Sequence, residues 1–232
     1  MPVRRRPPRR QPRSADTRLR IMDAALQIFG EQGYDGAMTR DIAHAAGVQQ
    51  PLINYHFGNK EGLWRAAVTH LFDQLRARFA DTMPGLARLD ARQAFAVVLR
   101  QFVHFNAEHP ELTRLMIKEA TAHSKRLEWV VNTHIRPTFD AVLSLVRAVQ
   151  QRGSLRGIDP ASAYYLFMGA ATGVFVMAPA YRLLTGADAF DATRRDAYAD
   201  AVVQLFLPGH SAPRRRAGDR LPPALRLARR AN

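Results

Sequence analysis

Two short helical patterns, separated by a glycine and a proline four residues apart, constrain this chain more than any other feature. In the first pattern, Ile42, Ala45 and Ala46 have the i, i+3, i+4 spacing of a helix that packs one face against a core. Gly47 suits the left-handed backbone conformation that ends such a helix. Pro51 suits the first turn of a new helix, because its φ is fixed and its missing N–H is not needed there. The sequence therefore predicts two short helices joined by a tight turn.

The ends of both helices carry residues that suit helix termini. Thr39 is placed to cap the first helix with its hydroxyl. In the second helix, Ile53 and Phe57 are four residues apart and share the inner side. Gly58 ends this helix, and Asn59 caps the next one. Two helices of this size with a glycine-containing turn form a helix-turn-helix, whose second helix fits the major groove of DNA.

The rest of the second helix offers side chains that can recognise DNA. The amides of Gln50 and Asn54 donate and accept hydrogen bonds, as reading a base edge requires, and Leu52 can contact a thymine methyl group. Arg40, in the first helix, can reach guanine or phosphate. Four further donors suit the phosphate backbone, which fixes the register of a protein on DNA without reading its sequence: Thr39, Tyr55, His56 and Lys60.

Over residues 17–65 the chain resembles the TetR/AcrR (tetracycline-repressor-like) family of bacterial transcriptional regulators. The resemblance rests on TRLRIMDAALQIFGEQGYDGAMTRDIA, on AAGV and on INYHFGNKEGL. It implies phosphate contacts by Thr39, Tyr55, His56 and Lys60, and base-facing positions for Arg40, Gln50, Pro51, Leu52 and Asn54. Many members have two adjacent aromatic residues before the histidine. Here the first of these is Asn54, which offers an amide in place of a stacking ring.

The formal net charge of +14 is concentrated at the two ends of the chain. Residues 1–15 contain six Arg and no acid, and residues 208–232 contain seven Arg and one Asp, whereas five basic and five acidic residues balance between 17 and 65. The proline-rich, charged ends are predicted to be disordered. An Arg-rich arm beside a helix-turn-helix either enters the minor groove or only adds non-specific affinity, and the sequence leaves both open. The arm residues concerned are Arg4, Arg5, Arg6, Arg9, Arg10 and Arg13.

After Lys60 the helical patterns become longer. Apolar residues at helical spacing fill residues 63–79, 95–103, 112–119 and 127–153. The first of these helices starts beside the helix-turn-helix and is expected to end at Met83-Pro84-Gly85, and Pro137 is expected to kink or break the last. No segment shows the alternation of a strand, so the sequence predicts an all-α fold.

Residues 160–181 contain no charged side chain and include Gly169 and Gly173 in the GxxxG spacing that is also found in membrane helices. Their many Ala, Gly, Ser, Thr and Tyr residues, and Pro179, argue against a membrane span. A helix without a polar face is expected to be buried on both sides. The family resemblance implies that helices at about 160–184 and 189–207 pair with a second copy. Such a homodimer presents two reading helices to a pseudo-palindromic operator.

The resemblance also implies an unidentified small-molecule effector that binds in the helical body. The candidate pocket consists of large apolar or adaptable side chains with two polar anchors: Phe102, Met116, Glu119, Trp129, His134 and Phe175. A plain hydrophobic core contains the same kinds of residue at the same spacing. Spacing alone therefore does not separate a pocket from a core.

Several classes of chemistry find no support in the sequence. The chain has no cysteine, which excludes disulfides and thiolate sites and agrees with a cytoplasmic protein. It has no GxSxG, P-loop, HExxH or dinucleotide-binding glycine motif. The eight histidines are scattered and lack the spacing of metal ligands on one helix face. We therefore predict no catalytic residue, no metal site and no cofactor.

Together these features predict a DNA-binding domain at 16–62, an effector-binding and dimerisation domain at 63–207, and disordered basic segments at 1–15 and 208–232. The predicted function is a ligand-responsive transcriptional regulator, and the family resemblance implies a repressor. The sequence leaves an activator role open, because repression depends on the position of the operator, which the chain does not encode. It would bind double-stranded operator DNA as a homodimer and leave it when the effector binds. The alternative is a basic architectural or membrane-surface protein that acts through its Arg-rich ends.

Overall fold

The computed structural model describes residues 12–86, 88–122 and 124–209, and in these residues the chain is helical, with no strand. The predicted all-α fold is therefore confirmed. Most of the two segments predicted to be disordered lies outside the described residues. In chain order the elements are α1 (Pro12–Gly36), α2 (Thr39–Ala45), α3 (Pro51–Phe57), α4 (Lys60–Leu86), α5 (Ala91–Glu108), α6 (Pro110–Ala120), α7 (Lys125–Val130), the π-helical turn η1 (Val131–Ile135), α8 (Arg136–Gln151), α9 (Pro160–Val176), α10 (Ala178–Thr185) and α11 (Ala192–Phe206).

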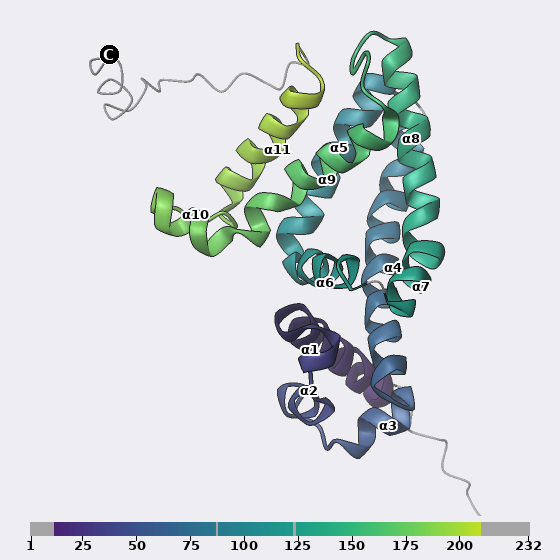
Figure 1. Cartoon of the computed structure of the whole chain (residues 1–232), viewed down its shortest axis with the longest axis vertical. Coiled ribbons are helices and arrows are strands. Elements are labelled where there is room, and N and C mark those ends of the chain that lie inside the picture. The colour runs from purple at the N-terminus through teal and green to yellow at the C-terminus, as the bar shows by residue number, and fades with distance from the viewer. Residues whose placement is uncertain (1–11, 87, 123, 210–232) are drawn as a thin grey trace, which may run out of the picture.

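Helices α1, α2 and α3 and the first turns of α4 form a unit at one end of the molecule, which we call the reading head (Figure 1). Each helix contributes a side chain with no exposed surface to its core: Phe29, Ile42, Ile53 and Trp64. Helices α2 and α3 have only seven residues each and depend on this packing, because such short helices are unstable alone. The predicted helix-turn-helix is confirmed.

Helix α1 includes residues that the sequence predicted to be disordered. It begins at Pro12, inside the segment predicted to be a disordered arm (1–15), because proline fits the first turn of a helix. Gly33 has a φ of 76° and kinks the helix, which then continues to Gly36. The kink lets Tyr34 pack against the core of the reading head.

Helix α4 runs from the reading head into the rest of the molecule, which we call the body (Figure 1). Its predicted inner side is buried, as shown by Leu63, Ala67, Leu71 and Leu75. The predicted break at Met83-Pro84-Gly85 is wrong, because the helix continues to Leu86. Pro84 lies in the last turn, so a distortion that it causes affects only the end of the helix.

Pro137 neither interrupts nor ends the helical segment in which it lies. Helix α7 leads through the π-helical turn η1 into α8, of which Pro137 is the second residue. A proline ring collides with the carbonyl of the residue four positions earlier in a regular helix, and the wider turn before it relieves this collision. The change of helix type also places His134 in the interior.

The body contains a second core between α5, α8, α9 and α11. Phe95, Val146, Phe167 and Val203, one from each helix, are buried there. At the edge of this core, Glu108 of α5 pairs with Arg78 of α4 and lies 3.9 Å from Nη1 of Arg195 of α11. Helices α4, α5 and α11 are therefore joined by charge as well as by apolar packing.

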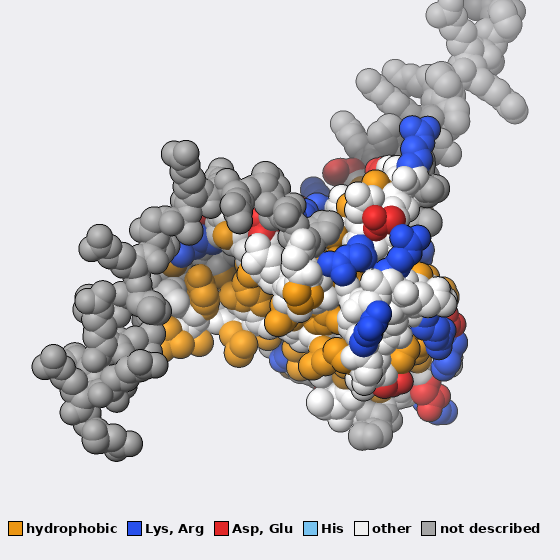
Figure 2. All heavy atoms as spheres, turned by 90° about the horizontal axis from the view of Figure 1, so that it is seen from above, with side chains coloured by type: hydrophobic (Ala, Val, Ile, Leu, Met, Phe, Trp, Pro, Cys, Tyr) orange, Lys and Arg blue, Asp and Glu red, His pale blue; other side chains and the backbone are white. Residues whose placement is uncertain are grey.

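The segment predicted as one helix at 160–184 is two helices, α9 and α10, bent by 67°. In the described residues no single helix is long and apolar enough to cross a membrane, and this bent pair passes that test by length and composition only. The expected burial on both sides is not found within one chain. Four large apolar side chains of α9, α10 and α11 are largely exposed, namely Tyr165 (71%), Leu183 (89%), Leu184 (86%) and Leu205 (68%). Figure 2 shows apolar side chains gathered on the side where α10 and α11 lie in Figure 1.

The junction of α3 and α4 generates a first prediction. A Cβ atom on Gly62 would lie 2.1 Å from the carbonyl oxygen of Phe57, the last residue of α3. We expect Gly62→Ala to lower the free energy of unfolding by about 1–3 kcal/mol, because backbone has to move. Gly85→Ala in the same helix is the control. No atom lies within 4 Å of its added Cβ, so it should be neutral or stabilising by up to about 1 kcal/mol. Urea denaturation of both variants measures the difference, and equal stabilities would contradict the packing.

Buried His134 generates a second prediction. Its Nδ1 lies 3.3 Å from Nη1 of Arg76, its Nε2 lies 3.3 Å from Oγ1 of Thr69, and its ring stacks on Phe72 at 4.8 Å. A guanidinium only donates hydrogen bonds, so Nδ1 accepts and the ring is neutral. Burial, and then the charge of Arg76, lower the pKa of His134 below its usual value, whereas Asp73 acts in the opposite direction.

The unfolded chain therefore takes up a proton at a higher pH than the folded one. Stability should fall as pH drops below about 6.5, by at most about 1.4 kcal/mol per pH unit for this histidine. We expect His134→Gln to flatten this slope in urea denaturation between pH 7.5 and 5. The exposed His44→Gln variant controls for loss of a histidine as such. An unchanged slope in His134→Gln would show that the buried ring titrates alike in both states.

Candidate nucleic-acid interface

Helix α2 begins at Thr39 itself, so the prediction that Thr39 caps this helix is wrong. The N-cap is Met38, whose backbone is extended and whose side chain accepts no hydrogen bond from the helix. Thr39 is the first helical residue, and its hydroxyl accepts a hydrogen bond from Nε2 of Gln50, at 3.1 Å. The hydroxyl is thus used for a contact between the two helices of the motif.

Helix α3, the reading helix, has the predicted ends. Pro51 is its first residue, and Gly58 is its C-cap. Asn59 Oδ1 accepts a hydrogen bond from the backbone N–H of Gly62 at 2.8 Å, which caps α4 as predicted. Ile53 is fully buried under α3 and Phe57 is half-buried, so the polar side chains of α3 face outward.

Two arginines of α1 hold the carboxyl ends of α2 and α3. Arg20 Nη2 donates to the carbonyl oxygen of Ala46 at 2.9 Å, and Arg18 Nη1 donates to that of His56 at 3.0 Å. Arg18 also lies over the ring of Phe57, 4.5 Å from its centre. The last carbonyls of a helix lack partners within it and carry its partial negative charge, so a cation stabilises them. The sequence does not predict these two contacts, because the partners are 26 and 38 residues apart in the chain. It shows the two arginines only as positive charges.

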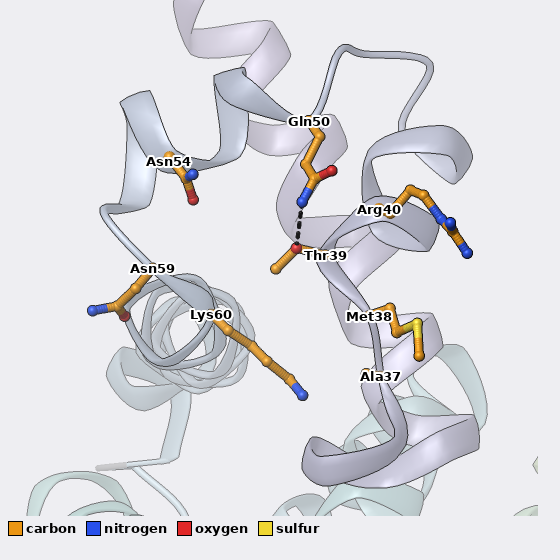
Figure 3. Close-up of a pocket in the computed structure, with 8 residues that line it drawn as sticks. All are labelled: Ala37, Met38, Thr39, Arg40, Gln50, Asn54, Asn59 and Lys60. Carbon is orange, nitrogen blue, oxygen red and sulfur yellow. Dashed lines mark hydrogen bonds between the residues drawn. The ribbon is translucent and has the colours of Figure 1, made fainter.

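Five of the predicted DNA-contacting residues line one hollow. It has a volume of about 620 Å³ and lies between α2, α3 and the start of α4 (Figure 3). Its lining consists of Thr39, Arg40, Gln50, Asn54 and Lys60, together with Ala37, Met38 and Asn59. The hollow is thus walled by amides, a hydroxyl and two cations, which are the groups that bind base edges and phosphates.

Lys60 is the most constrained cation of this hollow. Its Nζ donates to the carbonyl oxygen of Asp35 at 3.3 Å and lies 4.6 Å from the centre of the Tyr34 ring. Arg40, in contrast, has a side chain that is 77% exposed and only a 3.6 Å contact with Asp41. An exposed ion pair of this kind is worth little, so Arg40 can exchange it for a DNA contact.

A second hollow, of about 550 Å³, contains the predicted base-facing residue Leu52. Its lining comes from α1, α2, the turn and α3: Thr17, Arg20, His44, Gly47, Val48, Gln49 and Leu52. Gln50 and Asn54 face the first hollow and Leu52 the second, so α3 projects between two concave surfaces. A projecting helix with hollows on both sides fits a groove between two phosphate backbones.

The remaining candidates line neither hollow. Tyr55 is 79% exposed, its ring centre lies 5.1 Å from that of His56, and Pro51 is also exposed. Of the predicted arm, Arg4, Arg5, Arg6, Arg9 and Arg10 lie outside the described residues. Arg13 belongs to α1, with only its backbone described.

The six candidate effector residues are divided between the two cores. Met116 and Trp129 pack against the core that includes the reading head, and the rings of Trp129 and His134 lie 5.0 Å apart. Phe175 belongs to the second core, and Phe102 packs against both. Glu119 is buried and accepts hydrogen bonds from Arg126 Nε at 3.3 Å and from Ser124 Oγ at 3.0 Å. Within residues 12–86, 88–122 and 124–209, no three His, Asp or Glu side chains are placed to hold a metal ion.

Sequence comparison finds relatives of both parts of the chain. The family model described as bacterial regulatory proteins, tetR family, matches residues 21–67, and the one described as tetracyclin repressor-like, C-terminal domain, matches residues 92–205. The HTH-type transcriptional regulator RutR of Escherichia coli is 24% identical over 189 residues, which are 82% of this chain and 88% of RutR. The HTH-type transcriptional regulatory protein RaaS of Mycobacterium tuberculosis is 33% identical over 112 residues, which are 45% of this chain and 52% of RaaS.

Solved structures share the fold. AibR, in complex with isovaleryl coenzyme A and operator DNA, has a TM-score of 0.66 and 15% identity, and the match covers 83% of this chain and 98% of AibR. FadR from Bacillus subtilis, in complex with stearoyl-CoA, has a TM-score of 0.60 and 18% identity, covering 83% of this chain and 99% of FadR. The matched segments extend over the reading head and most of the body, and the chain belongs to the TetR family of bacterial regulatory proteins.

Proposed function

We propose that this regulator is a repressor that binds a pseudo-palindromic operator as a homodimer and is released by a small molecule. The observation that carries the proposal is the exposed polar rim of α3 beside a hollow lined by amides and cations. Gln50 and Asn54 would read base edges from this rim, and Thr39 and Lys60 would bind phosphate. The family assignment favours this function over an architectural or membrane-surface protein.

The exposed apolar face of α9, α10 and α11 supports a homodimer. Leu183 and Leu184 are almost fully exposed, and Tyr165, Leu166 and Leu205 are largely exposed. Contiguous exposed apolar surface of this kind is typical of an interface. A second copy of this chain is the proposed partner, because a twofold dimer presents two copies of α3 to two half-sites about one turn of DNA apart.

Three contacts offer a route by which the body could influence the reading head. Helix α6 lies against α1, where Lys118 Nζ donates to the carbonyl oxygen of Glu31 at 2.8 Å. The guanidinium of Arg126, from α7, lies 3.7 Å from the centre of the Tyr34 ring. Nζ of Lys60 lies 4.6 Å from the centre of the same Tyr34 ring. A ligand that moves α6 or α7 would therefore shift the cation at the start of α4 and the spacing of the two reading helices.

Acyl-coenzyme A thioesters are the first ligands to test as effectors. They occur in the solved structures of AibR and FadR, which share this fold. The two cores of the body supply the apolar surface that an acyl chain needs.

Selection of bound sites from random DNA tests the proposed function. We expect an inverted repeat whose half-sites are about one helical turn apart. On that site Asn54→Ala should lower affinity by about 1–3 kcal/mol and leave binding to unrelated DNA unchanged, because the amide contacts one base pair. Deletion of residues 1–11 should weaken binding to every sequence and reduce its salt dependence, because the segment contains five Arg. Recovery of no preferred sequence would refute the function.

The contact between Arg126 and Tyr34 generates a prediction about coupling. Both tryptophans of the chain lie at this joint, with the rings of Trp64 and Trp129 5.9 Å apart. Because coupling between two sites is reciprocal, operator binding should change tryptophan emission. Arg126→Lys keeps the charge beside Glu119 and loses the planar stack on Tyr34, so it should reduce this change. Lys125→Ala, at the neighbouring exposed position, is the control and should keep the full change. An equal response from wild type and Arg126→Lys would exclude this route.

A further inference from the structure

The side chain of Gln50 is held in place before any DNA is bound. Gln50 is the N-cap residue of α3, yet its side chain makes no capping hydrogen bond. Instead, its amide nitrogen donates to the hydroxyl of Thr39, the first residue of α2, at 3.1 Å (Figure 3). Both residues line the first hollow, so this bond lies on the surface proposed to face DNA.

The direction of this bond determines what each partner can still offer. An amide nitrogen has two N–H groups, and one of them is used on Thr39. The amide oxygen, Oε1, points away from Thr39 and is available as an acceptor (Figure 3). The Thr39 hydroxyl accepts from Gln50, so its own proton remains available for donation. The pair thus offers an acceptor and a donor on the amide, and a second donor on the hydroxyl.

The other residues of the hollow indicate which part of the DNA each group contacts. Lys60 and Arg40 also line the hollow and supply its positive charge. Gln50 is exposed and Thr39 is half-buried, so the amide reaches further outward than the hydroxyl. A phosphate fits the hydroxyl and the cations, whereas the edge of a base fits the projecting amide.

We propose that Thr39 and Gln50 act as one reading unit that selects adenine in the major groove. Oε1 accepts a hydrogen bond from the 6-amino group of adenine, and the remaining N–H of the amide donates to N7. Thr39 holds the amide in this orientation and donates its own proton to a phosphate, which makes Thr39 a positioning residue for base reading. Guanine has acceptors at both corresponding positions and leaves Oε1 without a donor. This inference rests on the proposed function and specifies the base that one of its residues reads.

Thr39 matters here because a free glutamine side chain loses rotamer freedom when it binds, and that loss lowers affinity. A glutamine that is already oriented avoids part of the loss and also cannot turn its nitrogen toward guanine without giving up the bond to Thr39. Removing the hydroxyl should therefore reduce discrimination between bases as well as general affinity. A threonine that only contacted phosphate would affect all sequences equally.

The test uses the full-length chain on the operator recovered by selection. At each adenine of one half-site, the base is replaced by purine, which lacks the 6-amino group, or by 7-deazaadenine, which lacks N7. We expect one adenine at which each replacement weakens binding by about tenfold or more, as for loss of a base contact. Gln50→Ala should bind the original and replaced operators equally. Thr39→Val, which keeps the branched shape without the hydroxyl, should lose most of the discrimination, and Thr39→Ser should retain it.

Asn54→Ala is the matched control, because Asn54 lines the same hollow and should affect a different base pair. Circular dichroism of each variant confirms that the helices are intact. Three results would overturn the inference and leave the proposed function standing. Thr39→Val could discriminate between bases as well as the wild type does, or the wild type could bind equally well without the 6-amino group at every adenine. The third result is a preference for guanine that depends on Gln50. Failure to recover any preferred sequence would refute the proposed function itself.

Discussion

The burial of one side of α4 in a single continuous core holds the reading head and the body together. Trp64, Val68 and Leu71 follow one another along α4 with almost no exposed surface. The same cluster of buried side chains includes Ile53 under the reading helix and Leu115 of α6. Since protein interiors are close-packed, a displacement at α6 is transmitted to neighbouring side chains of the cluster that also supports α3. The proposed control of α3 by a ligand in the body would use this connection.

The sequence predicted those parts of the reading head that depend on neighbours in the chain. The turn at Gly47, the start at Pro51 and the cap at Asn59 are all set by backbone preferences within a few residues. Thr39 shows the limit of such reasoning. Its side chain suits an N-cap, but Met38 takes that position and the hydroxyl bonds to Gln50 instead. A partner 11 residues away thus overrode the local preference.

Contacts between distant segments were not predictable from one sequence. In the sequence Arg18 and Arg20 are part of a neutral charge balance, whereas their contacts with the ends of α3 and α2 depend on how α1 lies across the motif. The size and polarity of side chains indicate effector candidates but do not show which helices pair. Trp129 and Phe175 consequently fall in different cores, and Glu119 is already paired with Arg126. Helix spacing identifies a buried face, but the partner of that face is a property of the whole fold.

The near neutrality of the reading head has a physical advantage for selectivity. Affinity for any DNA rises with the number of phosphates that a surface neutralises, and this gain is the same for every sequence. In the reading head two arginines have an acidic partner, Arg40 with Asp41 and Arg65 with Glu61. The proposed contacts of the reading head are directional hydrogen bonds from amides and hydroxyls, and such bonds form fully only on a matching base edge. A surface of this kind gains little affinity on a non-matching site, which is what selective binding requires.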